Sequence, residues 1–299
     1  MKTAELDIIY ISYDEPNAEL NYADLLNKAP WAKRVHGVKG SDAAHKAAAE
    51  KSETEWFVTV DGDNLVYDKF LDLDIEEVPK TFAYSWCGEN NINGLRYGNG
   101  GLKIWNKDFV LNMKTHEAAD NDSAKVDFCW EEGYRNFPFV FSQSVINHSP
   151  YQAWRAGFRE GVKMLTKNGV LVPLTKVRDE IYWHNLHRLR IWSTVGAHAT
   201  NGYFAMLGAR MGTYKALCTD WDYVQVRDFD CLAEIYKEVR EEDVIEMYVN
   251  YGDLIRRHIG FNWANFNHEQ SLYIIELYKE AISLGQTYYN KDPIWKNSF

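Results

Sequence analysis

The hydrophobic pattern of the first 65 residues predicts strands and helices in turn. Short runs of Ile, Val, Tyr, Phe and Trp, ended by Pro, Gly, Asn or Asp, predict strands over residues 8–12, 34–38 and 56–60. Helical patterns fill the segments between them, 18–28 and 43–51. The third strand is apolar or β-branched throughout, as in a strand covered on both faces. This alternation predicts an α/β fold with a parallel sheet and helices on both of its faces.

The hydrophobic pattern changes twice in the remainder of the chain. Residues 82–148 show short strand patterns between Gly-rich segments, whereas 151–167 return to helical spacing and 230–290 are mostly helical. No repeat or low-complexity tract interrupts the pattern. We expect an α/β domain over residues 1–225, which binds both nucleotide sugar and acceptor, with a helical C-terminal extension over 226–299.

Composition and charge narrow the class of protein. The 299 residues are 46% hydrophobic and 25% charged, which is typical of a folded globular chain. The net charge of −10 argues against a protein that coats nucleic acid through its whole surface. The four Cys are far apart and show no zinc or disulfide spacing, and no apolar run is long enough to span a membrane. We therefore expect a cytoplasmic protein without a membrane anchor.

The sharpest chemical signal is Asp61-Gly62-Asp63, directly after the third predicted strand. Ligands of open α/β sheets bind beyond the carboxyl ends of strands. Two neighbouring carboxylates repel each other unless a cation lies between them, and their oxygens suit Mg²⁺ or Mn²⁺. An ordinary Asp-Gly turn is the alternative. An EF-hand is excluded, because Val66 occupies the position that needs Gly.

Three features within 65 residues resemble the nucleotide-sugar half of glycosyltransferases of the GT-A type. They are YDEPN after the first strand, a Gly-Ser-Asp-capped helix with His45, and WFVTVDGDN. The resemblance implies a Rossmann-like α/β fold with a mixed, mostly parallel sheet flanked by helices. It also implies a UDP-sugar donor, and Mn²⁺ or Mg²⁺ on the DxD motif. Carried over residue by residue, it implies a nucleotide site of Tyr13, Asp14, Glu15, His45 and Asp61, with Asp61 and Asp63 as metal ligands.

Longer blocks over residues 6–215 resemble glycosyltransferases of T4-like tailed phages. These blocks are YISYDEPNAELNY, APWAKRVHGVKGSDAAHKAAA, FVTVDGD, NGLRYGNGGLKIW, SPYQAWRAGFREGVK and LRIWSTVG. This chain has DGDN where the group commonly has DGDA, which keeps both acids. The resemblance implies a hexosyl- or pentosyltransferase in the host cytoplasm, with 5-hydroxymethylcytosine in phage DNA as acceptor and arabinose or glucose as the sugar. A glycan or protein acceptor, a nucleotidyltransferase and a non-catalytic binder are the alternatives.

The same comparison implies further site residues. His148 is the candidate for a third metal ligand, and Asp127, with Glu131 nearby, for the group that accepts the proton of the acceptor hydroxyl. Gly100 and Gly101 resemble the Gly-rich loop that borders the donor sugar. A solvent-facing His, acids on a helix surface and a plain hairpin turn are the respective alternatives.

Overall fold

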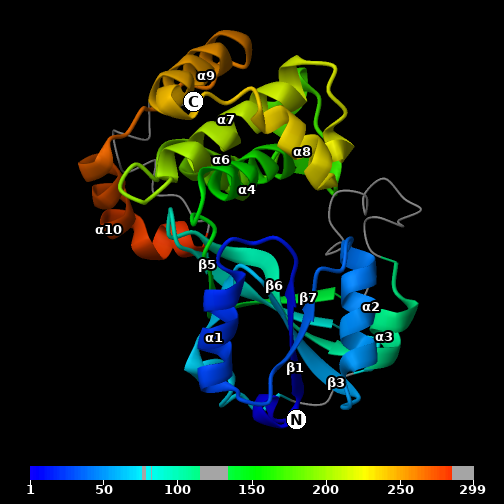
Figure 1. The fold of residues 1–299 in the computed structure, drawn as a ribbon. Helices are drawn as coiled ribbons and strands as arrows, with labels where there is room; N and C mark the ends of the chain where they lie inside the picture. The colour runs from blue at the N-terminus through cyan, green and yellow to red at the C-terminus, as the bar shows by residue number, and fades with distance from the viewer. Residues whose placement is uncertain (76–78, 82, 115–133, 285–299) are drawn as a thin grey trace. The chain divides into compact units, whose positions relative to one another are not determined.

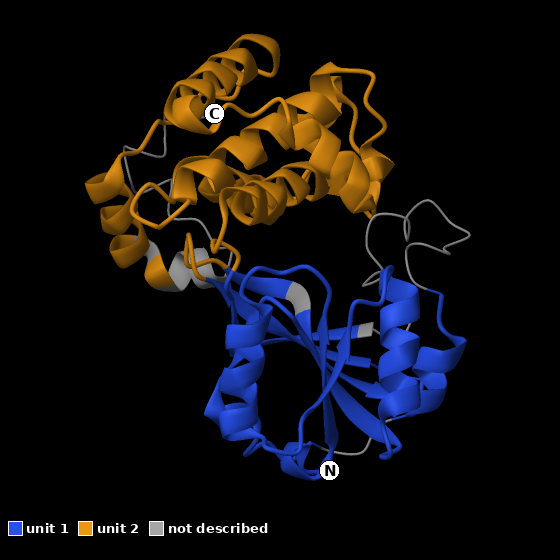
Figure 2. Ribbon diagram, in the orientation of Figure 1, with its two compact units in different colours: residues 1–90, 96–145 blue, residues 91–95, 146–299 orange. Residues whose placement is uncertain are grey.

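The computed structural model describes residues 1–75, 79–81, 83–114 and 134–284 (Figure 1). The chain divides into two compact units (Figure 2). Unit 1 comprises Met1–Asn90 and Arg96–Val145, and unit 2 comprises Asn91–Leu95 and Ile146–Phe299. The expected division into an α/β domain over residues 1–225 and a helical extension over 226–299 stays a prediction.

Unit 1 is built on one seven-stranded sheet, in the order β2-β1-β3-β6-β5-β7-β4. β1 lies parallel to both β2 and β3, and β5 lies parallel to β7, whereas β6 runs antiparallel to β3 and β5, and β4 antiparallel to β7. This mixed α/β sheet confirms the predicted fold class. The strands are β1 (Asp7–Ser12), β2 (Lys33–His36), β3 (Trp56–Asp61), β4 (Asn64–Val66), β5 (Ala83–Asn90), β6 (Arg96–Asn106) and β7 (Tyr134–Ser144).

Helices cover both faces of this sheet, as the sequence predicts (Figure 1). Ile8 and Tyr10 of β1 pack with Leu25 in one hydrophobic cluster. Ile9, between them in the strand, packs with Ala48 in a second cluster. This alternation is what a strand buried on both faces requires. The helices of the unit are α1 (Ala18–Lys28), α2 (Ser41–Lys51) and α3 (Lys107–Asn112), with short 3-10 turns η1 (Thr3–Glu5) and η2 (Asp68–Phe70).

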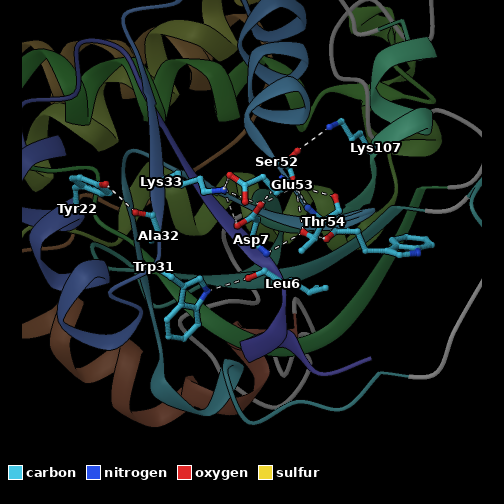
Figure 3. Close-up of polar contacts among 11 residues, drawn as sticks. Leu6, Asp7, Tyr22, Trp31, Ala32, Lys33, Ser52, Glu53, Thr54 and Lys107 are labelled. Atoms are coloured by element: carbon cyan, nitrogen blue, oxygen red, sulfur yellow. Dashed lines mark hydrogen bonds and ion pairs between the residues drawn. The ribbon is translucent and has the colours of Figure 1, made fainter.

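A polar network ties together the amino ends of the parallel strands (Figure 3). The Asp7 carboxylate accepts hydrogen bonds from the Glu53 amide at 2.5 Å and from the Lys33 ammonium at 3.1 Å. Lys33 also pairs with the Glu53 carboxylate at 3.1 Å. Burial acts to raise the pKa of Asp7, but these donors outweigh it and hold that pKa below its ordinary value. The network fixes the end of the sheet opposite the DxD motif.

Unit 2 is mostly helical. Its helices are α4 (Pro150–Lys163), α5 (Val177–Glu180), α6 (Trp183–Thr194), α7 (Gly202–Cys218), α8 (Phe229–Tyr236), α9 (Val244–His258) and α10 (His268–Leu284). A hairpin of β8 (Thr166–Lys167) and β9 (Val170–Leu171) follows α4, and the 3-10 turns are η4 (Leu174–Lys176), η5 (Tyr223–Arg227) and η6 (Glu241–Asp243).

Glycines set the close approach of α4 and α7. A Cβ on Gly157 or Gly161 of α4 would overlap backbone carbonyls of α7, and a Cβ on Gly208 or Gly212 of α7 would overlap those of α4. Each pair is spaced four residues apart and therefore lies on one face of its helix. The two helix backbones consequently touch without side chains between them.

Arg210 of α7 holds three other segments of unit 2. Its side chain is fully buried and donates to the carbonyls of Ser193, Tyr248 and Ala264 at 2.8–3.0 Å and to the side chain of Asn265 at 2.7 Å. The guanidinium lies 3.7 Å from the centre of the Tyr248 ring. Burial lowers the pKa of Arg210 to about 10, so the group still carries its charge at neutral pH.

Candidate functional site

The Asp61-Gly62-Asp63 motif turns the chain at the carboxyl end of β3. Asp61 is the last residue of β3 and pairs with Ile11 of β1. Asp61 and Asp63 are partly exposed, whereas Gly62 and Asn64 are buried. Buried and partly exposed residues thus alternate along the motif. Both carboxylates remain accessible, and the backbone between them is held in the interior. β3 also lies where parallel pairing with β1 changes to antiparallel pairing with β6.

Two buried side chains hold the Gly62 carbonyl. The Tyr10 hydroxyl lies 2.7 Å from it and 2.9 Å from the Ala18 carbonyl, and the Asn21 amide donates to the Gly62 carbonyl at 3.0 Å. The Val145 amide donates to the Asp63 carbonyl at 2.7 Å. Burial, together with the nearby Glu15 and Asp63 carboxylates, raises the pKa of Tyr10, so its hydroxyl stays protonated and able to donate. The backbone of the motif is therefore fixed by the protein itself.

The loop after β1 packs directly against the motif. A Cβ on Gly62 would lie 2.6 Å from the Glu15 carboxylate oxygen Oε2 and 3.1 Å from the Ser12 Cβ. That carboxylate accepts a hydrogen bond from the Tyr13 amide at 2.8 Å, while the Tyr13 and Asp14 side chains are exposed. The structure thus brings the predicted nucleotide loop to the predicted metal motif, and a side chain at Gly62 would disturb both.

His45 of helix α2 is buried against strand β6. It is 5% exposed, its Nδ1 donates to the Ser41 carbonyl at 2.8 Å, and its ring meets Trp105 edge-on at 5.6 Å. The ring therefore has a fixed place between α2 and β6. Its expected contact with the nucleotide stays a prediction.

Gly100 and Gly101 lie inside strand β6, not in the loop that the sequence suggests. A Cβ on Gly101 would overlap the side-chain amide of Asn64. Close approach of a neighbouring side chain therefore accounts for Gly101, and a border on the donor sugar stays a prediction for both glycines.

The roles expected for the remaining residues stay predictions. Asp127 and Glu131 lie outside the described residues. His148 belongs to unit 2, where its ring is exposed and its backbone amide donates to the Gln152 side chain at 2.9 Å. Within the described part of the chain, no group of three or more His, Cys, Asp and Glu side chains is arranged to hold a metal ion.

A polar cluster at the ends of β1 and β2 is absent from the sequence prediction. Arg34 Nε donates to the Ser12 hydroxyl at 2.9 Å, and Arg34 Nη2 donates to His36 Nδ1 at 3.1 Å. Ser12 Oγ also lies 2.9 Å from that nitrogen. Because a guanidinium only donates, His36 Nδ1 is the acceptor in its contact with Arg34. Ser12 at the end of one predicted strand, and Arg34 and His36 within the next, were the polar signal that could have revealed this cluster.

Comparisons with known proteins find distant structural similarity. No family model and no curated protein matches it. One similar structure is a glycosyltransferase involved in the glycosylation of the major capsid of PBCV-1, at 17% identity and a TM-score of 0.28, covering 48% of this chain and 82% of that one. HddC from Yersinia pseudotuberculosis matches at 17% identity and a TM-score of 0.27, covering 46% and 71%. Such values are too low to transfer a function.

No helix among the described residues has both the length and the apolar character needed to cross a membrane.

Proposed function

We propose that this chain is a metal-dependent GT-A-type glycosyltransferase that moves a sugar from a UDP-sugar to a hydroxyl group. The observation that carries the proposal is the anchored motif at the end of β3, where two accessible carboxylates flank a buried Gly62. A rigid backbone with paired acids at the carboxyl edge of a mixed α/β sheet suits a cation that bridges to phosphate oxygens.

The donor set of Asp61 and Asp63 fits Mg²⁺ or Mn²⁺. Both ligands are carboxylates, and Mg²⁺ is commonly held by one or two carboxylates while water and substrate phosphates complete its shell. When bound, such an ion supplies positive charge that stabilises the leaving diphosphate. Asp61 and Asp63 would hold it, and His148 is proposed as a further ligand.

The nucleotide is proposed to bind along the neighbouring strand ends. Tyr13, Asp14 and Glu15 form the loop that packs on the motif through Glu15, and His45 of helix α2 is proposed to face the nucleotide. The Arg34 guanidinium, which also pairs with the Glu19 carboxylate at 2.7 Å, and the His36 ring lie in β2 and suit the carbonyls of a base or the hydroxyls of a ribose.

The acceptor hydroxyl is proposed to be that of 5-hydroxymethylcytosine in phage DNA, with arabinose or glucose as the transferred sugar. Asp127 would accept the hydroxyl proton, with Glu131 beside it in the sequence, and Gly100 and Gly101 would border the sugar. This acceptor implies action in the host cytoplasm. The net charge of −10 requires that DNA contact only a limited part of the surface.

Thermal unfolding tests the donor site. Mn²⁺ with UDP should raise Tm, since ligand at a hundred times its Kd stabilises a folded protein by about 2.7 kcal/mol. Asp63→Asn should remove this shift and retain the Tm of the ligand-free protein, because a partly exposed strand-end carboxylate contributes little to the core. An unchanged Tm of the original protein at millimolar UDP and Mn²⁺ would refute the donor site.

A second assay separates the reaction classes. The protein is incubated with a panel of UDP-sugars and hydroxymethylated DNA, which is then digested to nucleosides for mass spectrometry. A glycosylated nucleoside and released UDP support the proposal, whereas pyrophosphate released from a nucleoside triphosphate indicates a nucleotidyltransferase. Acceptor affinity that falls steeply with salt supports DNA, and affinity independent of salt indicates a neutral glycan.

A further inference from the structure

Asn64, the residue after the DxD motif, lies between Asp63 and strand β7. Its side chain is 3% exposed. The amide nitrogen Nδ2 donates to Asp63 Oδ1 at 2.7 Å, and the amide oxygen Oδ1 accepts from the Ser142 hydroxyl at 3.1 Å. Ser142 itself is fully buried. One buried amide thus connects a candidate metal ligand to the interior of the sheet.

Strand pairing sets this arrangement. In the antiparallel pair of β4 and β7, Asn64 lies opposite Ser144 and Val66 lies opposite Ser142. Ser142 and Asn64 are therefore diagonal neighbours on one face of the sheet, within reach of polar side chains. The Asp63 carboxylate selects the orientation of the amide, because the reverse orientation would turn the amide oxygen toward it, and the Ser142 hydroxyl then donates to that oxygen.

Gly101 of β6 provides the space for the amide. A Cβ at this position would overlap the side-chain atoms of Asn64. Asn64, Ser142 and Gly101 come from three different strands, and each fits only in the presence of the others. A turn after β3 that bound no ligand would not require three residues from three strands to fit around one another.

We infer that the Ser142–Asn64 pair orients the Asp63 carboxylate before a divalent cation binds, which makes Asn64 a positioning residue of the metal site. The inference rests on the proposed function of Asp63. Hydrogen bonding of Oδ1 to Asn64 restricts rotation of the carboxylate, which would then meet a cation in one fixed orientation. Outer partners of this kind typically change metal affinity by about 10–100-fold when they are removed.

Mn²⁺ binding in the absence of any sugar tests the inference, with free Mn²⁺ measured by electron paramagnetic resonance. Asn64→Ala should weaken Mn²⁺ binding by about 10–100-fold. Ser142→Ala, which removes one oxygen and leaves Asn64 in place, should weaken it less. Thermal unfolding of each variant establishes that it is folded. If Asn64→Ala does not fold, Ser142→Ala decides.

If Asn64→Ala folds and binds Mn²⁺ with unchanged affinity, the inference is overturned. If Asn64→Ala is unfolded, unchanged affinity in a folded Ser142→Ala overturns it. Asp63→Asn separates this result from failure of the proposed function. Loss of Mn²⁺ binding in Asp63→Asn together with unchanged binding in the outer variants rejects only the positioning role. Unchanged binding in Asp63→Asn rejects the metal site itself.

A double-mutant cycle tests the role of Gly101. Gly101→Ala should lower both Tm and Mn²⁺ affinity, because the added methyl group displaces the Asn64 amide. In the Asn64→Ala background the same methyl group has space, so Gly101→Ala should have a much smaller effect there. Equal effects of Gly101→Ala in both backgrounds would contradict the coupling and assign Gly101 another role.

Discussion

The Gly62 carbonyl offers a quantitative test of how the DxD motif is anchored. Tyr10→Phe removes one of its two donors, a hydroxyl whose single hydrogen also has the Ala18 carbonyl within reach, and Asn21→Leu removes the other donor at similar side-chain volume. In each single variant the carbonyl keeps one partner. Each should therefore lower the free energy of unfolding by about 1 kcal/mol, the typical contribution of one hydrogen bond.

The double variant should lose more than the sum of the singles. Removal of Tyr10 and Asn21 together deprives the buried Gly62 carbonyl of both donors, and an unsatisfied buried acceptor costs about 1–3 kcal/mol in addition. This coupling exceeds the deviation of about 0.5 kcal/mol that independent sites show. Because Gly62 lies between Asp61 and Asp63, Mn²⁺ binding should also weaken most in the double variant.

Denaturant unfolding of the four proteins measures the coupling, and a shared slope against denaturant establishes that the variants unfold to the same extent. Additive losses would show that Tyr10 and Asn21 do not share the Gly62 carbonyl. An additive result accompanied by unchanged Mn²⁺ affinity would refute the view that this anchor preforms the metal site.

Two further predictions concern the frame of each unit. The pKa of Asp7 is lowered in the fold, so its ion pair with Lys33 should stabilise the protein at pH values above the pKa of an unfolded Asp. This stabilisation should be lost as the pH falls through the folded pKa. In Asp7→Asn, the free energy of unfolding should therefore change less with pH in acid. Gly208→Ala should lower the free energy of unfolding by about 1–3 kcal/mol from overpacking, despite a helix-propensity gain of about 1 kcal/mol, because the methyl group would overlap the Trp154 carbonyl. Gly37→Ala, where the left-handed backbone has open space around it, should cost about 1 kcal/mol from strain alone, and an equal loss in both variants would contradict the packing argument.

The first 65 residues could be interpreted from local pattern alone. The helix predicted over 18–28 matches α1, and the strand predicted over 56–60 matches β3 to within one residue. Apolar runs buried on both faces and ended by Gly, Pro or Asp leave few alternatives, and the position of Asp61 and Asp63 follows from the end of that strand.

Strand β6 was not predictable in this way. Its glycines suggest a loop, yet the strand runs over Arg96–Asn106. Gly98 and Gly101 are needed because side chains of other strands, Asn136 and Asn64, occupy the space where their Cβ atoms would lie. Such requirements come from residues distant in sequence, and no local pattern contains them.

The same limit applied to the site. The sequence shows that DGDN keeps both acids, but the partner of Asn64 is Ser142, 78 residues further along the chain. Ser12, Arg34 and His36 likewise meet only when β1 and β2 pair. Acids that end a strand can be located from sequence, whereas the side chains that orient them depend on strand register.

The position of Arg210 implies that much of unit 2 opens as a single cooperative block. One guanidinium binds the end of α6, the middle of α9 and the segment at residues 264–265, so none of these can detach without leaving a buried cation with unmet donors. Amide hydrogens at the centres of α6, α7 and α9 should therefore exchange with solvent at a common rate. A binding event that tightens one of these helices would then slow exchange in all three.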